Sequence, residues 1–144
     1  MTLDLRFPSD PRLLQIVRSV VGQMSALCGF EDEETQFIVL AVDEACANII
    51  RHSYCGRADG EIRLTCAARD ERIEFVLVDW GRAPCEPGRL QPRSLEEVRP
   101  GGLGMHLIQS IMDEVRYRFG ERENELYLAK SLPRRKIHSG VVTE

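Results

Sequence analysis

Apolar residues recur along the chain with two different periods, and the period predicts which segments are strands and which are helices. From residue 3 to 7 they alternate with polar residues, as in a short half-buried strand. From residue 13 to 27 they form the broad stripe of an amphipathic helix, with Asp10 as its N-cap and Pro11 at its first position. The chain is therefore expected to begin with a strand followed by a helix.

A central helix is predicted over about residues 32–53, and its middle is apolar on almost every side. Only Asp43, Glu44 and Asn48 interrupt this apolar run, and a helix of this kind is normally buried. At helical spacing Glu44, Asn48 and His52 form one polar line on one face. Because burying a charge or an unpaired amide is costly, this line predicts the floor of a functional site.

The second half of the chain returns to strands, interrupted by one loop and one helix. Residues 82–101 are rich in glycine and proline and lack periodicity, which is typical of a lid or binding loop. An apolar helix is expected over residues 105–112. Alternating segments predict four strands in two hairpins: residues 61–67, 73–79, 115–119 and 125–131. The order indicates an α+β, two-layer sandwich, with a largely antiparallel mixed sheet and helices on one face.

Composition and charge narrow the classes of partner. The 144 residues are 43% hydrophobic and 29% charged, which predicts a single domain over residues 1–132 and a polar tail over 133–144. A net charge of −4 with interspersed signs argues against nucleic acid as a direct partner. The absence of a signal segment or a transmembrane-length apolar run predicts a cytoplasmic protein that does not bind membranes.

The cysteines give no sign of a metal site or a disulfide framework. Their number is odd, and their spacing contains no Cys-x-x-Cys and no pairing with the histidines. We therefore expect reduced thiols and no structural zinc. This expectation covers Cys28, Cys46, Cys55, Cys66 and Cys85.

Three short motifs could carry chemistry, and each alone has a plain structural explanation. Glu44 and Asn48 could be a buried pair satisfied by a neighbouring strand. Asp79-x-Gly81 follows a strand, where such residues make ordinary turns. Gly102-x-Gly104 opens a helix, where glycine often serves only as a flexible entry. For each motif on its own, both the structural and the functional explanation remain open.

Together the motifs are more specific, because they supply complementary parts of a nucleotide site. A glycine-rich helix start lets backbone N–H groups approach phosphate oxygens. An amide oxygen such as that of Asn48 can ligate Mg²⁺, and a nearby carboxylate can take a proton from an attacking hydroxyl. A buried carboxylate at a strand end can accept a hydrogen bond from the amino group of adenine.

The same residues carry a resemblance to a known family. Glu44-Ala45-x-x-Asn48-x-Ile50-x-His52-x-Tyr54 is similar to the N-box of the GHKL (Bergerat-fold) ATP-binding domains, and Asp79-Trp80-Gly81 to their G1 box. Gly102-Leu103-Gly104-Met105 is similar to their G2 box. The resemblance spans about residues 3–132 and is to the stand-alone branch of bacterial anti-sigma factor serine/threonine kinases. It implies a Bergerat-type sandwich with an ATP lid.

The resemblance also implies a role for each residue that matches. Glu44 would be the general base, and Asn48 would bind Mg²⁺. Asp79 would contact the adenine amine, and Gly81 would let the ring approach. The cofactor-binding set would be completed by the residues that support the groove or wrap the phosphates: His52, Arg99, Gly101, Gly102, Leu103, Gly104 and Met105.

The function implied is that of a partner-switching kinase. Such a protein binds Mg²⁺ with ATP or ADP, holds a sigma factor inactive, and phosphorylates a STAS-domain anti-sigma factor antagonist. Arg18 would contact a protein partner, and the chain would form a homodimer. The alternative is a nucleotide-gated binding module without significant kinase activity, and Glu44 favours the kinase because binding alone hardly requires a buried base. A third possibility is an unrelated function with boxes that match by coincidence.

Overall fold

Five strands form one antiparallel sheet in the computed structural model, which describes residues 1–82, 85 and 103–134. Their order across the sheet is β1-β2-β3-β5-β4. Every neighbouring pair is antiparallel, so the expected α+β architecture is confirmed, and the described strands lack the parallel pairing of a mixed sheet. The strands are β1 (Thr2–Pro8), β2 (Glu61–Arg69), β3 (Arg72–Asp79), β4 (Glu114–Phe119) and β5 (Asn124–Ser131).

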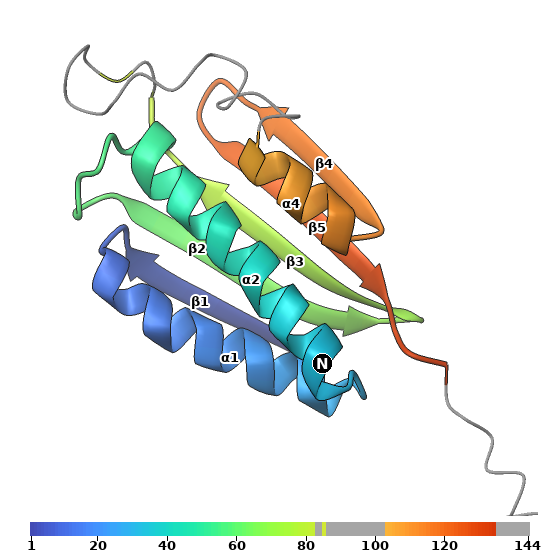
Figure 1. Cartoon of the computed structure of the whole chain (residues 1–144). Helices are drawn as coiled ribbons and strands as arrows, with labels where there is room; N and C mark the ends of the chain where they lie inside the picture. The colour runs from blue at the N-terminus through green and yellow to red at the C-terminus, as the bar shows by residue number, and fades with distance from the viewer. Residues whose placement is uncertain (83–84, 86–102, 135–144) are drawn as a thin grey trace, which may run out of the picture.

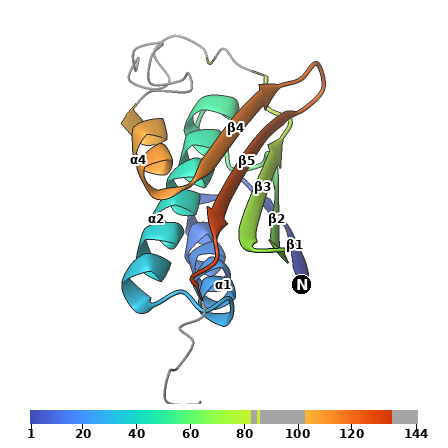
Figure 2. The same cartoon turned by 90° about the vertical axis from the view of Figure 1, so that its right-hand side faces the viewer.

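The helices cover one face of this sheet, as Figures 1 and 2 show. A short 3-10 turn, η1 (Pro11–Leu13), leads into α1, and the side chain of Asp10 accepts a hydrogen bond from the backbone N–H of Arg12. None of the helices in the described part of the chain is long and apolar enough to span a membrane. The helices are α1 (Leu14–Leu27), α2 (Asp32–Asn48) and α4 (Leu103–Ile111).

The central helix changes geometry before it ends. α2 stops at Asn48, and the chain continues to Ser53 as the π-helix η2 (Ile49–Ser53). Hydrogen bonds from the N–H of Tyr54 to the Ile49 oxygen and from the N–H of Gly56 to the Ile50 oxygen close its last turns. Single π-helical turns occur frequently at functional sites, and this one carries the residues that follow Asn48.

The core lies between the sheet and the helices, and the alternation of β3 places a carboxylate at its end. Ile73, Phe75 and Leu77 are fully buried on the side that faces the helices. Asp79 continues the same alternation, so its side chain points into the same layer and is only 2% exposed. The buried apolar face of β3 therefore ends in a carboxylate, Asp79, at the edge of the core.

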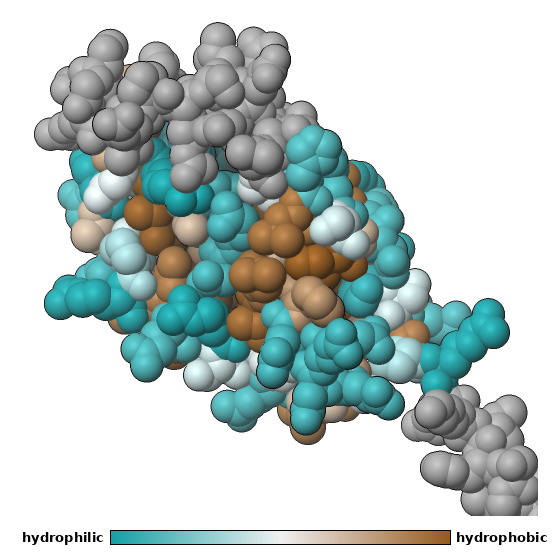
Figure 3. Space-filling view, viewed as in Figure 1, coloured by the Kyte–Doolittle hydropathy of each residue, from teal (hydrophilic) through white to brown (hydrophobic). Residues whose placement is uncertain are grey.

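One expectation about the central helix is wrong. The middle of α2 is not buried on all sides, because Phe37 and Leu40 are 48% and 44% exposed. The sheet lies beneath α2, and α1 and α4 lie on either side of it, so its outer face has no covering element among the described residues (Figure 1). Ile16 and Leu27 of α1 are also exposed, and Figure 3 shows apolar surface on this helical face.

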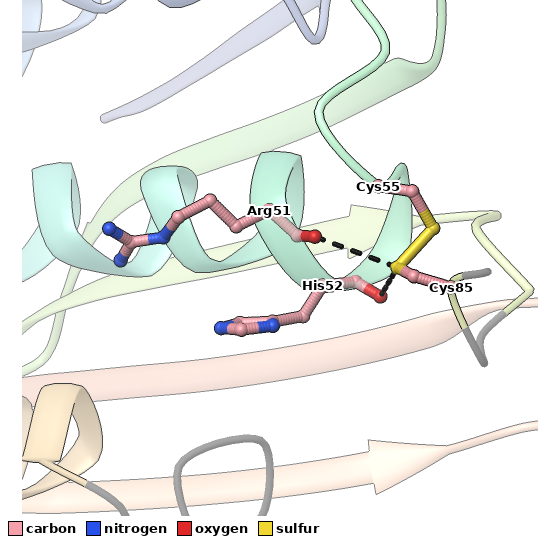
Figure 4. The surroundings of a disulfide bond; sticks show 4 residues. All are labelled: Arg51, His52, Cys55 and Cys85. Carbon is pink, nitrogen blue, oxygen red and sulfur yellow. Dashed lines mark hydrogen bonds between the residues drawn. A yellow bond between two sulfur atoms is a disulfide. The ribbon is translucent and has the colours of Figure 1, made fainter. Parts of the chain in front are cut away.

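The expectation of five reduced cysteines is also wrong for two of them. Cys55, just after η2, and Cys85, after β3, form a disulfide with their Cα atoms 5.4 Å apart (Figure 4). They are separated by 30 residues in the sequence, so only folding brings them together. Cys28, Cys46 and Cys66 are free thiols.

Candidate functional site

A cavity of about 200 Å³ lies where η2, α4 and the ends of β4 and β5 meet. Four residues predicted from the sequence line it together: Asn48, His52, Gly81 and Met105. The other lining residues are Ala45, Ile49, Ser53, Arg82, Tyr117, Phe119, Gly120, Asn124 and Leu126. The three sequence motifs therefore converge on one hollow, although they come from separate segments of the chain.

Asp79 and Glu44 are not among the residues that line this cavity, but Asp79 is hydrogen-bonded to two residues that are, Gly81 and Asn124. The Asp79 Oδ1 atom accepts hydrogen bonds from the backbone N–H of Gly81 at 3.0 Å and from the Asn124 amide at 2.9 Å. Burial raises the pKa of the Asp79 carboxyl, whereas hydrogen bonds from Asn124, Gly81 and Ser53 act in the opposite direction. The result is a fixed, dehydrated acceptor group, which suits recognition of an N–H donor on a ligand.

Asn124 is a site residue that the sequence reasoning missed. It pairs directly with Asp79 across β3 and β5, and its amide also donates to the Gly81 carbonyl oxygen at 3.0 Å. The sequence placed it in a polar turn before the strand. The available signal was its position two residues before Leu126, which puts both side chains on the buried face of β5.

Gly81 is required by a close backbone approach. A Cβ atom at this position would collide with the carbonyl oxygen of Ser53 at the end of η2. The turn after β3 therefore passes directly against the π-helix, which brings the Asp79 motif to the central helix.

Gly81→Ala is expected to lower the free energy of unfolding by about 1–3 kcal/mol, because backbone must move to admit the methyl group. Gly22→Ala is the matched control, since its Cβ would meet only Val39 Cγ2 at 3.5 Å, and the change is expected to be neutral or stabilising. Urea titration of both variants measures the effect. An unchanged midpoint for Gly81→Ala would contradict the close approach.

The buried carboxyl of Asp79 predicts a pH-dependent stability. Its pKa is raised in the folded chain, so the stabilisation is complete below the unfolded value, near 3.8, and is lost as pH rises through the folded value. Asp79→Asn does not titrate. Its unfolding free energy relative to the original chain should therefore increase as pH rises through this range. Denaturant titrations at a series of pH values test this, and a difference independent of pH would refute it.

Glu44 and Asn48 are joined by a cation that the sequence reasoning did not single out. The Nη2 atom of Arg51 donates to Glu44 Oε1 at 3.2 Å and to Asn48 Oδ1 at 3.0 Å. The side chains of Glu44 and Arg51 are 26% and 33% exposed, so the cluster can be reached from solvent. Arg51 follows Asn48 by three residues and Glu44 by seven, and this helical spacing was the sequence signal that could have identified it.

The start of α4 packs against the same pair. A Cβ atom on Gly104 would lie 2.8 Å from both Glu44 Oε1 and Asn48 Nδ2. The glycine therefore allows the first turn of α4 to approach the polar side chains of α2. This contact brings the glycine motif at the start of α4 against the Glu44 and Asn48 motif of α2.

The remaining predicted site residues lie at the start of α4, outside the described residues, or away from the cavity. Leu103 begins α4, while Arg99, Gly101 and Gly102 lie outside the described residues and stay predictions. Arg18 is not among the residues that line the cavity. It lies on α1 and forms an ion pair with Asp43 of α2, with its Nη1 atom 2.9 Å from Asp43 Oδ1.

The sandwich, the cavity and the converging motifs define a nucleotide-binding domain of the GHKL class. A family model described as "Histidine kinase-like ATPase domain" matches residues 7–130, and the chain belongs to this family. The resemblance predicted from the sequence is confirmed. An ATPase domain also implies that ATP or ADP is the nucleotide bound.

Curated relatives lie in the same branch. The chain is 29% identical over 122 residues to "Serine-protein kinase RsbW" of Bacillus pumilus. The aligned region covers 78% of this chain and 75% of the relative. The chain is 26% identical over 121 residues to the protein of the same name in Bacillus subtilis, with coverages of 79% and 76%. The predicted resemblance to the serine/threonine kinase branch is confirmed.

A solved structure supports the fold. The structure of "the RsbU and RsbW domains of Rv1364c from Mycobacterium tuberculosis" is similar with a TM-score of 0.67 and 18% identity. The similarity covers 92% of this chain and 32% of that chain, so the present chain spans about a third of its length. At this identity the likeness concerns the fold.

Proposed function

We propose that this chain is an ATP-dependent serine/threonine protein kinase of the anti-sigma factor type, which works in a partner-switching circuit. The observation that carries the proposal is the cluster of Glu44 and Asn48 against the start of α4, next to a cavity whose lining residues Gly81 and Asn124 are hydrogen-bonded to the buried Asp79 carboxylate. The Glu44 carboxylate suits a general base for phosphotransfer and has no evident use in nucleotide binding alone. The serine-protein kinase names of the relatives support serine as the acceptor.

ATP would lie with its adenine at the Asp79 end of the cavity. The Asp79 carboxylate would accept a hydrogen bond from the adenine amino group, and Gly81 would leave room for the adenine ring. The phosphates would extend toward the first turn of α4, where free backbone N–H groups and the helix dipole favour negative charge. Met105, in the first turn of α4, also lines the cavity.

Asn48 fits the role of a magnesium ligand. Its Oδ1 atom already faces a cationic group, the Arg51 guanidinium, and Mg²⁺ prefers oxygen ligands of this type. When bound, Mg²⁺ would neutralise phosphate charge. Because two cations on one oxygen repel each other, binding would require Arg51 to release Asn48.

Glu44 would act as the general base. It lies one turn before Asn48 and is partly exposed, so an acceptor hydroxyl brought to the start of α4 could reach it. The carboxylate would orient the serine hydroxyl and take its proton as the oxygen attacks the γ-phosphate. Arg51 would have to leave Glu44 free for this step, because its hydrogen bond occupies one carboxylate oxygen.

The protein partners proposed are a STAS-domain antagonist as phosphate acceptor and a sigma factor as the protein held inactive. Arg18 would contribute to such a surface, since its side chain is 45% exposed beside its partner Asp43. Homodimer formation through α1 and β1 is part of the same proposal. Exposed apolar side chains on α1, such as Ile16, suit a surface that binds protein.

Two measurements on the full chain test the proposal. Calorimetry should show ATP binding that strengthens with Mg²⁺, and incubation with a STAS-domain antagonist should transfer the γ-phosphate to one of its serines or threonines. ATP binding without transfer to any candidate would favour the nucleotide-gated binding module. Absence of ATP binding would refute both functions.

A further inference from the structure

The disulfide partners stand at the Asp79 end of the cavity. Cys55 follows the lining residues His52 and Ser53, and Cys85 follows the lining residues Gly81 and Arg82. Figure 4 shows the bond joining the end of the central helix to the segment after β3. The bond therefore ties together two walls of the candidate nucleotide site, because the lining residues named here are two to four positions from a cysteine.

Cys85 has a defined place against η2. Its Sγ atom lies 3.5 Å from the carbonyl oxygen of His52 and 3.7 Å from that of Arg51. A free thiol in this position could donate a weak hydrogen bond to either oxygen. Cys55 adopts a φ of 57°, which is uncommon for a residue other than glycine, and it forms the turn that presents its sulfur to Cys85.

Contacts other than the disulfide also join the two segments that carry the cysteines. The Trp80 N–H donates to the Tyr54 hydroxyl at 2.9 Å, and the side chain of Ser53 hydrogen bonds with Asp79. These contacts already connect the end of η2 with the end of β3. Breaking the disulfide leaves these contacts in place and removes one tie on the segment that carries Arg82, whose Nη1 atom still donates to the Gly120 carbonyl oxygen at 3.0 Å.

The other three cysteines are poor competitors for oxidation. Burial raises the pKa of Cys66 to about 12 and raises that of Cys46 further, and both thiols are completely enclosed. Burial also raises the pKa of Cys28, which has no neighbouring cysteine partner in the structure. Thiolate character and access govern oxidation, so the half-buried pair Cys55 and Cys85 is favoured.

We propose that reversible oxidation of Cys55 and Cys85 is a redox control of the nucleotide site, with the disulfide form binding nucleotide more tightly. This inference rests on the proposed function, because it assigns a regulator to that same site. In the disulfide form, the tie at Cys85 helps to hold Arg82 where it lines the cavity. In the dithiol form, nucleotide binding must fix Arg82 without this tie, and the ordering lowers the affinity.

The chemistry needs a two-electron oxidant, and hydrogen peroxide supplies it. One thiolate of the pair attacks a peroxide oxygen, which forms an S–O bond, breaks the O–O bond and leaves a sulfenic acid and water. The second thiol attacks that sulfur, forms the S–S bond and expels a second water. The two thiols lose two electrons and two protons in total, and a dithiol reductant reverses the change by exchange.

The test compares the full-length chain reduced with dithiothreitol and the same chain oxidised with hydrogen peroxide. We expect five free thiols in the first form and three in the second. Calorimetry with Mg²⁺ and a non-hydrolysable ATP analogue should show affinity about threefold to tenfold lower in the reduced form, restored by reoxidation. Cys85→Ser should stay at the reduced value under both conditions, whereas the control Cys28→Ser should keep the switch.

A readout without nucleotide separates this inference from the proposed function. Amide exchange at Gly81 and Arg82, and fluorescence of the only tryptophan, Trp80, should differ between the two forms. Equal ATP affinity in both forms, or five free thiols after peroxide, would overturn the redox control and leave the kinase proposal intact. Loss of ATP binding in both forms with altered exchange would refute the function while supporting the coupling of the disulfide to the cavity.

Discussion

Glu44→Gln is expected to reduce phosphotransfer by about 10²–10⁴-fold while Mg-ATP binding is retained. The amide keeps the size of the side chain and an oxygen that can accept from Arg51 Nη2, so the cluster at the start of α4 should keep its shape. It cannot accept a proton from the attacking serine. The measurement is the rate of γ-phosphate transfer to a STAS-domain antagonist, alongside calorimetry with Mg-ATP.

Two further variants make this first result specific. Glu33→Gln changes an exposed acid in the first turn of the same helix. It should leave the rate of phosphate transfer and the affinity for Mg-ATP unchanged. Asn48→Ala should remove the Mg²⁺ dependence of ATP binding, because the proposed ligand is lost. If Glu44→Gln transfers phosphate at the rate of the original chain, Glu44 is not the base, and the assignment of roles along α2 fails.

Asp79→Asn is expected to weaken ATP binding by about 30–100-fold, because the variant presents an amide N–H₂ to the adenine amino group instead of an oxygen. Folding should survive the change. The amide oxygen can still accept from the Gly81 N–H and the Asn124 amide, and the new N–H₂ can donate to the Ser53 hydroxyl. The loss should therefore be one of recognition.

Inosine triphosphate sharpens this second result, because it carries an oxygen where adenine carries the amino group. The original chain should prefer ATP to inosine triphosphate, and Asp79→Asn should lose or reverse that preference. Asp59→Asn, at an exposed acid, is the control and should bind like the original chain. Equal losses for both nucleotides, with a lowered unfolding midpoint, would show that Asp79 is structural and not an adenine contact.

Much of the fold follows from local patterns. The alternating segments became β1, β2, β3, β4 and β5 within a few residues of the expected limits, because a half-buried strand imposes a period of two on its own sequence. The helices were equally visible from their apolar stripes. The three boxes could be joined into one hypothesis because each carries residue types that a particular part of a nucleotide requires.

Contacts between distant segments could not be obtained in this way. Asn124 looked like a turn residue until pairing of β5 with β3 set it opposite Asp79. Arg51 was not singled out in the sequence, although its contacts with Glu44 and Asn48 lie within one helical stretch. The position of Asn124 depends on the register of β5 against β3, which no local pattern shows.

By itself, therefore, the sequence determined the order of the elements, the buried side of each strand and the chemistry of the boxes. The tertiary structure alone decided that the outer side of α2 is exposed at Phe37, and that Cys55 meets Cys85. The physical reason is the range of the interactions. Periodicity and capping act over one or two turns of chain, whereas burial and cross-linking depend on which segments pack together after folding.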